Sequence, residues 1–187
     1  MRRLLLFCVV AVMTVAASGS AGAADLSGVN KDDVLYLDLK DGRVTILLRP
    51  DKAPNTVKRI KELVRQHFYD GLKFHRVIDG FMAQTGDPNG DGTGGSGQKL
   101  KAEFNDLPHV RGAVSMARAA DPDSADSQFF ICLAPAFYLD GQYTVFGRVI
   151  DGMEYVDHIK KGDPDNNGTV EDPDIIVKMQ VAADVDK

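Results

Sequence analysis

The sequence predicts one mainly β domain that carries two helices. Runs of alternating apolar residues recur along the chain, and turn signals such as Asp41-Gly42 and Asp79-Gly80 separate them, which is typical of antiparallel strands. Two other segments show apolar residues at the spacing of an amphipathic helix. The 187 residues contain no repeat, low-complexity tract or linker that would divide the chain, so we expect a single hydrophobic core.

The first 23 residues have the organisation of a secretory signal peptide. Arg2 and Arg3 precede an uncharged apolar run, residues 4–17, and Ala21-Gly22-Ala23 forms a small-residue cleavage site. Because the run is short for a transmembrane helix, an uncleaved anchor is the weaker alternative. The chain is therefore expected to be exported, and to be periplasmic if its source is a Gram-negative bacterium. Residues 24–33 would be a leader before the domain, residues 34–183.

Composition limits the classes of partner. The chain is 44% hydrophobic and 26% charged, and removing residues 1–23 takes away two arginines and no acid, which changes the formal net charge from −5 to −7. Such an acidic domain is not expected to bind nucleic acid through a basic patch or to associate stably with anionic membranes. Cys132 would be the one cysteine left, so no intrachain disulfide can form, and its apolar neighbours predict a buried small hydrophobe.

Apolar alternation predicts the strands. Residues 34–39 and 44–48 alternate on either side of Asp41-Gly42, which predicts a hairpin. Six further segments have a strand pattern: residues 74–78, 82–85, 112–116, 128–133, 144–150 and 175–181. The turns between them favour antiparallel pairing.

Helical spacing and end signals predict the two helices. Pro54 is allowed in the first turn of one helix, which ends before Tyr69-Asp70-Gly71. Asp151, with Glu154 three residues later, predicts the N-cap of the other, and Gly162 predicts its end. The buried stripes would be Val57, Ile60, Val64 and Phe68 in the first helix, and Met153, Val156 and Ile159 in the second.

Two loops have features of ligand-binding loops. Residues 86–97 are rich in glycine but lack a Gly-Lys-Ser/Thr sequence and a dinucleotide spacing, and Gln98 stands where a calcium loop needs an acid. Residues 163–174 match the calcium-loop positions one, three, five, six, nine and twelve, yet they lead into a predicted strand where an EF-hand needs a helix. A surface loop and an acidic turn are the favoured interpretations, and calcium binding at residues 163–174 stays the alternative.

Residues 74–87 contain a cation and an amide among large apolar side chains. The tight turn at Asp79-Gly80 would place Arg76 and Gln84 on two neighbouring strands, with Arg76 on the same face as Phe74 and Ile78. An arginine among apolar residues needs partners, because a buried unpaired charge is costly. Considered alone, such an arginine is more often a surface ion-pair partner.

Residues 74–87 are followed in order by four further motifs, residues 112–117, 127–132, 139–141 and 145–149. Together these motifs resemble the cyclophilin family of peptidyl-prolyl cis-trans isomerases, in an exported bacterial-like form. The resemblance covers residues 34–181. It implies a closed eight-stranded antiparallel β-barrel capped by two α-helices. It also implies an isomerase that acts on X–Pro bonds of exported or unfolded proteins, without cofactor or metal. The partners would be proline-containing polypeptide segments, and a monomer is the default.

The resemblance assigns the site residues. Arg76 would be the catalytic cation, and Gln84 would hold Arg76 and bind the substrate backbone. The substrate-binding residues would be Phe81, Met82, Ala117, Arg118, Ala119, Gln128, Phe130, Tyr138, Leu139 and Tyr143.

Three of these residues depart from the pattern that is usual in the family. Arg118 stands where asparagine is usual; it should be tolerated, and it would favour acidic segments in clients. Tyr138 stands where many members have tryptophan, and the missing indole donor leaves cyclosporin sensitivity open. Tyr143 replaces a common histidine but retains an aromatic wall, so we expect activity to survive.

Other catalytic classes find little support in the sequence. The four histidines show no zinc-like spacing with one another or with Cys132, and Ser115 and Ser127 lack a nucleophile-elbow context. The remaining rival is a non-enzymatic module that binds proline-containing segments. The argument for the enzyme is the presence together of Arg76, Phe81, Gln84 and Phe130.

Overall fold

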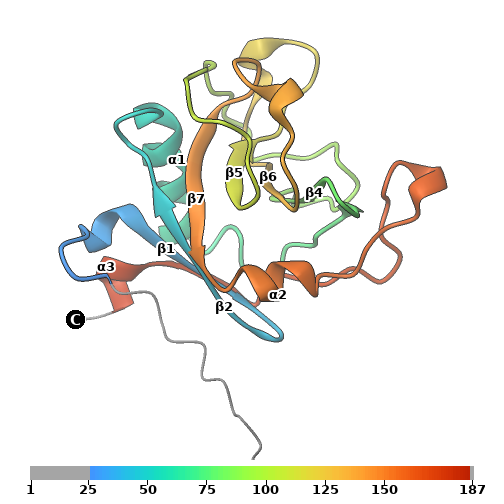
Figure 1. The fold of residues 1–187 in the computed structure, drawn as a ribbon, viewed down its shortest axis with the longest axis horizontal. Helices are drawn as coiled ribbons and strands as arrows, with labels where there is room; N and C mark the ends of the chain where they lie inside the picture. Colours follow the sequence, from blue (N-terminus) through green and yellow to red (C-terminus); the bar gives the residue numbers. More distant parts are fainter. Residues whose placement is uncertain (1–25, 186–187) are drawn as a thin grey trace, which may run out of the picture.

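The computed structural model describes residues 26–185, so the predicted signal peptide lies outside the described residues. Its framework is an eight-stranded antiparallel sheet with the strand order β3-β4-β6-β5-β7-β2-β1-β8 (Figure 1). The strands are β1 (Val34–Leu39), β2 (Gly42–Leu48), β3 (Arg76–Ile78), β4 (Met82–Thr85), β5 (Ala113–Met116), β6 (Phe129–Cys132), β7 (Val145–Asp151) and β8 (Lys178–Val181). Each of the eight predicted strand segments overlaps one of these strands, although β2 begins two residues earlier and β7 ends one residue later than predicted.

The predicted closed barrel is wrong. Strands β3 and β8 are the two edges of the sheet, and the sheet curls into a half-barrel. An irregular segment, residues 164–174, lies along the free edge at β3. The N–H of Val77 donates to Gly168 O at 2.8 Å, and the N–H of Phe74 donates to Asp174 O at 2.9 Å. This segment contains Pro164 and Pro173, which cannot donate to a ladder, so it covers the edge without extending the sheet.

Three α-helices lie among the described residues: α1 (Pro54–Arg65), α2 (Met153–Asp157) and α3 (Ala182–Val185). Four short 3-10 helices accompany them: η1 (Lys31–Asp33), η2 (Pro122–Ser124), η3 (Phe137–Leu139) and η4 (Pro164–Asn166). The third α-helix was not predicted. No helix in residues 26–185 is both long enough and apolar enough to cross a membrane.

Helix α1 buries the stripe that its period predicted, with Val57, Ile60 and Val64 inside and Phe68 partly buried beyond its end. The N-cap predicted for α2 is wrong. Asp151 is the last residue of β7, and Gly152 occupies the cap in a left-handed conformation with φ 79°. A Cβ at Gly152 would lie 2.3 Å from Arg43 O, so the close approach of β2 requires glycine at this point.

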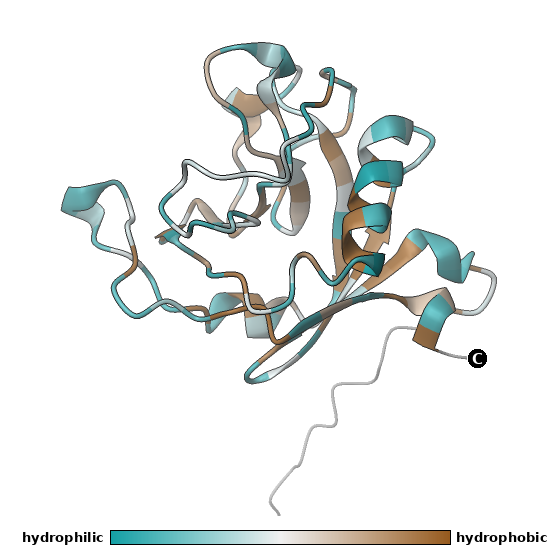
Figure 2. Ribbon diagram, turned by 180° about the vertical axis from the view of Figure 1, so that it is seen from behind, coloured by the Kyte–Doolittle hydropathy of each residue, from teal (hydrophilic) through white to brown (hydrophobic). Residues whose placement is uncertain are grey.

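The sheet has apolar side chains on both faces. The inner face packs against α1 and forms the main core, whose largest members include Leu37, Ile46, Phe129 and Phe146. In Figure 2, hydrophobic colouring recurs along the strands, whereas most of the loops have hydrophilic or intermediate colours. On the outer face, Met82, Ala113, Phe130, Cys132 and Val145 form a second buried cluster. This second cluster explains why all four residues of β6 are buried instead of alternating.

Cys132 belongs to this outer cluster and has no exposed surface. Burial raises the pKa of its thiol to about 12, which keeps the sulfur protonated and unreactive near neutral pH. The prediction that Cys132 packs as a small hydrophobe is confirmed.

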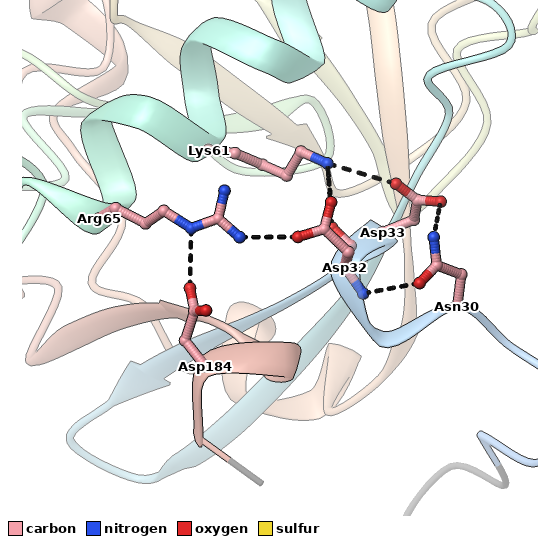
Figure 3. Close-up of polar contacts among 6 residues, drawn as sticks. All are labelled: Asn30, Asp32, Asp33, Lys61, Arg65 and Asp184. Carbon is pink, nitrogen blue, oxygen red and sulfur yellow. Dashed lines mark hydrogen bonds and ion pairs between the residues drawn. The ribbon is translucent and has the colours of Figure 1, made fainter. Parts of the chain in front are cut away.

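An ion-pair network joins both ends of the domain to α1 (Figure 3). The carboxylate of Asp32 in η1 accepts hydrogen bonds from Lys61 at 2.5 Å and from Arg65 at 2.7 Å. Arg65 also donates to Asp184 of α3 at 2.8 Å. Residues 31–33 of the expected leader are therefore fixed against the domain. We call Asp32, Lys61, Arg65 and Asp184 the terminal clamp.

Candidate active site

A shallow cavity of about 120 Å³ lies over the outer cluster. It is lined by nine of the twelve residues that the sequence assigned to the site: Arg76, Phe81, Met82, Gln84, Ala117, Arg118, Phe130, Leu139 and Tyr143. Two more, Ala119 and Gln128, line a neighbouring cavity of about 200 Å³. Tyr138 is exposed at the rim, with its ring 5.8 Å from that of Phe81. The structure thus gathers all twelve residues at one place.

Sheet register places the key side chains in a row. Arg76 on β3 lies opposite Gln84 on β4, and Gln84 lies opposite Phe130 on β6. Directly opposed residues of antiparallel strands share a face. The strands therefore carry a cation, an amide and an aromatic ring across the floor of the cavity. Phe74 does not share this face as expected, because it precedes β3 and packs in the inner core.

Hydrogen bonds fix the orientation of the amides. Arg76 Nη1 donates to Gln84 Oε1 at 3.2 Å, and Gln84 Nε2 donates to Gln128 Oε1 at 2.9 Å. Gln128 Nε2 in turn donates to Gly94 O at 2.8 Å in the glycine-rich loop. These hydrogen bonds leave the carbonyl oxygen of Gln84 facing the guanidinium of Arg76, and they connect the site to residues 86–97.

Asn167 also binds Arg76, a role that the sequence analysis did not predict. Arg76 Nε donates to the backbone O of Asn167 at 3.0 Å, and Nη2 donates to its Oδ1 at 2.9 Å. Arg76 Nη1 also makes a long contact, 4.0 Å to Met82 Sδ. Among the described residues, no carboxylate forms an ion pair with Arg76. Burial lowers the pKa of Arg76 from its ordinary value, but arginine remains charged in proteins.

Arg118 closes one side of the cavity. Its guanidinium lies 4.5 Å from the ring centroid of Tyr143, and it donates to the carbonyl oxygens of Gln142 at 3.0 Å and Ala119 at 2.9 Å. A cation over an aromatic face is attracted by the ring quadrupole. Arg118 therefore connects the segment after β5 to the segment before β7.

A buried histidine supports the same wall from behind. His109 Nδ1 lies 2.8 Å from Asp140 Oδ1, and its Nε2 lies 3.0 Å from Ser115 Oγ. Because a carboxylate only accepts, the proton of this contact is on Nδ1. The backbone and ring N–H groups of His109 lower the pKa of Asp140. The contacts hold the segment after η3, and so Leu139, against β5.

In both candidate ligand loops, acidic side chains already have partners within the protein. Asp87 accepts from the N–H groups of Asn89 and Gly92 at 2.8 Å and 2.6 Å. In the acidic loop, Asp163 caps η4, whereas Asp174 pairs with Lys40 at 2.8 Å. The first and last calcium-loop positions therefore have separate protein partners, which favours the acidic-turn interpretation. In residues 26–185, no cluster of three metal-ligating acidic, histidine or cysteine side chains is present.

A larger cavity, of about 520 Å³, lies further along the outer face of the sheet between β2, β7 and residues 107–113. It contains Arg49, whose guanidinium is engaged by Asp51 at 2.6 Å. It lacks the row of arginine, amide and aromatic side chains, so the smaller cavity is the better candidate for chemistry.

Comparison with known proteins identifies the family. Residues 34–181 match the model of the cyclophilin type peptidyl-prolyl cis-trans isomerase/CLD family. The chain is 49% identical over 184 residues to a probable peptidyl-prolyl cis-trans isomerase of Brucella suis, covering 92% of this chain and 91% of that protein. It is 46% identical over 131 residues to peptidyl-prolyl cis-trans isomerase B of Bacillus subtilis, covering 68% and 91%.

Solved structures agree with the sequence match. A cyclophilin from Hirschia baltica superimposes with a TM-score of 0.74 at 28% identity, covering 83% of this chain and 76% of that chain. A cyclophilin type isomerase of Cryptosporidium parvum, determined in the presence of the dipeptide Ala-Pro, gives a TM-score of 0.73 at 30% identity, covering 79% and 98%. The chain therefore belongs to the cyclophilin-type peptidyl-prolyl cis-trans isomerases.

Proposed function

We propose that this isomerase accelerates rotation about X–Pro bonds in exported or unfolded proteins and so assists their folding, with Arg76 as the cation that stabilises the twisted amide. The uncatalysed rotation is slow because the C–N bond is partly double, with a barrier of about 18–20 kcal/mol. A rate increase of about 10⁴ requires roughly 5.5 kcal/mol of transition-state stabilisation.

Rotation removes amide resonance and makes the prolyl nitrogen pyramidal and basic. A fixed cation close to that nitrogen stabilises the twisted state more than the planar one, and only such differential binding accelerates the step. A hydrogen bond from a charged donor contributes about 1.5–3 kcal/mol. Arg76 would therefore supply a factor of about ten to a hundred, and the apolar pocket and backbone contacts the remainder.

The observation that supports this role is the set of partners around Arg76. Three oxygen atoms of neutral groups hold its guanidinium, and no described carboxylate pairs with it. The guanidinium borders a cavity whose floor is Phe130, Met82 and Leu139, which suits a proline ring. The Cryptosporidium parvum relative was determined with an Ala-Pro dipeptide present, which supports the same ligand class for this chain.

The backbone after β5 would receive the extended peptide. Ala117 N–H already donates to Gln128 O at 2.9 Å, and Ala119 N–H donates to Ser124 Oγ at 2.9 Å. Arg118 is the residue of this segment whose N–H donates to no acceptor among the described residues. We therefore assign the backbone N–H of Arg118 as the donor to the peptide backbone. The expected peptide contact of residues 117–119 is thereby limited to this N–H.

The test is cis-to-trans relaxation of a short Ala-Pro peptide with the mature chain and with Arg76→Ala. We expect the variant to lose about a hundredfold in kcat/KM. Arg65→Ala is the matched control, because it removes an arginine of the terminal clamp, far from the cavity. Acceleration that survives Arg76→Ala contradicts the electrostatic role. A folded wild type that binds the peptide without acceleration would favour the binding-module alternative.

Export is part of the proposal and rests on residues 1–23. Expression of the full chain in a Gram-negative host, followed by N-terminal sequencing of the periplasmic fraction, should find a mature chain that begins at Ala24. An uncleaved chain in the membrane fraction would instead favour the anchor.

A further inference from the structure

A loop from the C-terminal part of the chain covers the free edge of β3. The N–H of Gly162 donates to Val77 O, and the N–H of Val77 donates to Gly168 O, both at 2.8 Å. The N–H of Val170 donates to His75 O at 3.1 Å. Residues 162–170 therefore follow the strand that carries Arg76, although they lie about ninety positions later in the sequence.

The conformation of this loop depends on the pair Asn167-Gly168. Asn167 is left-handed with φ 52°, and Gly168 follows with φ 78°. Asparagine is one of the few residues with a side chain that tolerate this region. A Cβ at Gly168 would lie 2.4 Å from Ile78 Cγ1, so the loop can approach β3 this closely only with glycine there.

The turn directs both oxygens of Asn167 at one guanidinium. Its backbone O receives the Nε–H of Arg76, and its Oδ1 receives an Nη2–H. A guanidinium has five N–H donors. With Gln84 taking one more, three donors are bound to oxygen, Nη1 also makes the long contact to Met82 Sδ, and the second N–H of Nη2 is left for a substrate.

We infer that Asn167 is a positioning residue for isomerisation, which fixes the plane of Arg76 and leaves its charge uncompensated. This inference rests on the proposed role of Arg76. A neutral amide suits the task because a carboxylate at the same position would form an ion pair and weaken the field at the prolyl nitrogen. The loop whose sequence resembles a calcium loop would then serve the isomerase site.

The first variant is Asn167→Gly, which removes Oδ1 but retains the backbone acceptor and relaxes the left-handed conformation. We expect kcat to fall about three- to tenfold with KM within about twofold of wild type, because a positioning contact acts mainly in the transition state. Asn166→Gly is the matched control: the neighbouring side chain is exposed and forms no hydrogen bond among the described residues. It should leave kcat unchanged.

The second variant is Asn167→Asp, which keeps the shape and an acceptor but adds a negative charge. Because its only large change is electrostatic, we expect a loss of kcat at least as large as that of Asn167→Gly, with an unchanged melting temperature. A merely structural role predicts wild-type kcat for this variant.

A measurement independent of activity completes the test. Nitrogen-15 NMR of the full mature chain should show the Nη2–H of Arg76 as a protected resonance in wild type and Asn166→Gly, and as a faster-exchanging one in Asn167→Gly, which loses the Oδ1 acceptor. Wild-type kcat in Asn167→Gly beside an impaired Arg76→Ala overturns the inference, as does an equal loss in the Asn166→Gly control. If Arg76→Ala is itself unimpaired, the proposed function of Arg76 fails, and the NMR result alone decides whether Asn167 holds the guanidinium.

Discussion

Arg65 in the terminal clamp and Arg76 in the cavity are the same residue type in opposite surroundings. Arg65 donates to the carboxylates of Asp32 and Asp184 at 2.7 and 2.8 Å, and these carboxylates raise its pKa. Arg76 donates to three neutral oxygens, and burial lowers its pKa. A carboxylate partner cancels most of an arginine's field, whereas a neutral partner fixes its geometry and leaves the charge. The difference separates an arginine that ties elements together from one that can act on a ligand.

Replacing Arg76 by lysine keeps the positive charge and removes the planar guanidinium with its several donors. We expect Arg76→Lys to lose about thirtyfold in kcat/KM, because an ammonium is a point charge that cannot satisfy Asn167 and Gln84 while facing the substrate. Arg65→Lys should retain full activity. Peptide relaxation assays on both variants check this, and equal activity of Arg76→Lys and wild type would show that positive charge alone suffices.

A second variant gives Arg76 the kind of partner that Arg65 has. Gln84→Glu places a carboxylate where Oε1 now lies 3.2 Å from Nη1. We expect about a tenfold fall in kcat, since part of the field is then directed at the new partner. Gln128→Glu is a useful control, because its side chain contacts Gln84 and not Arg76. A wild-type kcat for Gln84→Glu would contradict the importance of neutral partners.

Arg118 is an intermediate case, with carbonyl and aromatic partners at the cavity wall. We expect Arg118→Ala to raise KM about threefold with little change in kcat, because it loosens Tyr143 and the segment before β7 without removing the cation that acts. Peptides with an acidic residue near the proline should be affected more than neutral ones if Arg118 also selects clients. Equal effects on both peptide classes would restrict Arg118 to holding the wall.

The smallest expected effect concerns the terminal clamp. Exposed ion pairs contribute about 0.2–1 kcal/mol each, so Arg65→Ala should lower the melting temperature by only about 2–4 °C. The lowered pKa of Asp32, caused first by Lys61 and then by Arg65, means that its stabilisation is present above its unfolded pKa and is lost as the pH falls through the folded one. Acidification from about pH 5 to about pH 2 should therefore destabilise the wild type more than Asp32→Asn. Parallel thermal melts would show no such difference if the clamp contributes nothing.

Local patterns predicted local structure well. Alternation located the strands, and helical spacing gave the buried stripe of α1, because these periods depend on near neighbours in the chain. The N-cap at Asp151 failed because β7 continues through it to pair with Thr45, and the close approach of β2 leaves room only for Gly152. In that case a tertiary contact overrode the local signal.

Sequence motifs located residues that gather at the cavity, whereas residues that depend on distant contacts were missed. Nine of the twelve assigned residues line the cavity and the other three lie beside it, since neighbouring strands bring Arg76, Gln84 and Phe130 into one row. Asn167 and His109 were missed as supports, because each reaches its partner across a long sequence separation. The Asn167-Gly168 pair was a usable signal for a left-handed turn, but the acidic residues around it pointed to calcium.

The half-barrel has two edge strands, and other parts of the chain contact both. Residues 162–170 satisfy the backbone of β3, while Asp70 accepts the N–H of Met179 in β8 at 2.9 Å. Bare strand edges readily add a strand from another chain. Because residues 162–170 already occupy the free edge of β3, this edge cannot add a strand from another chain.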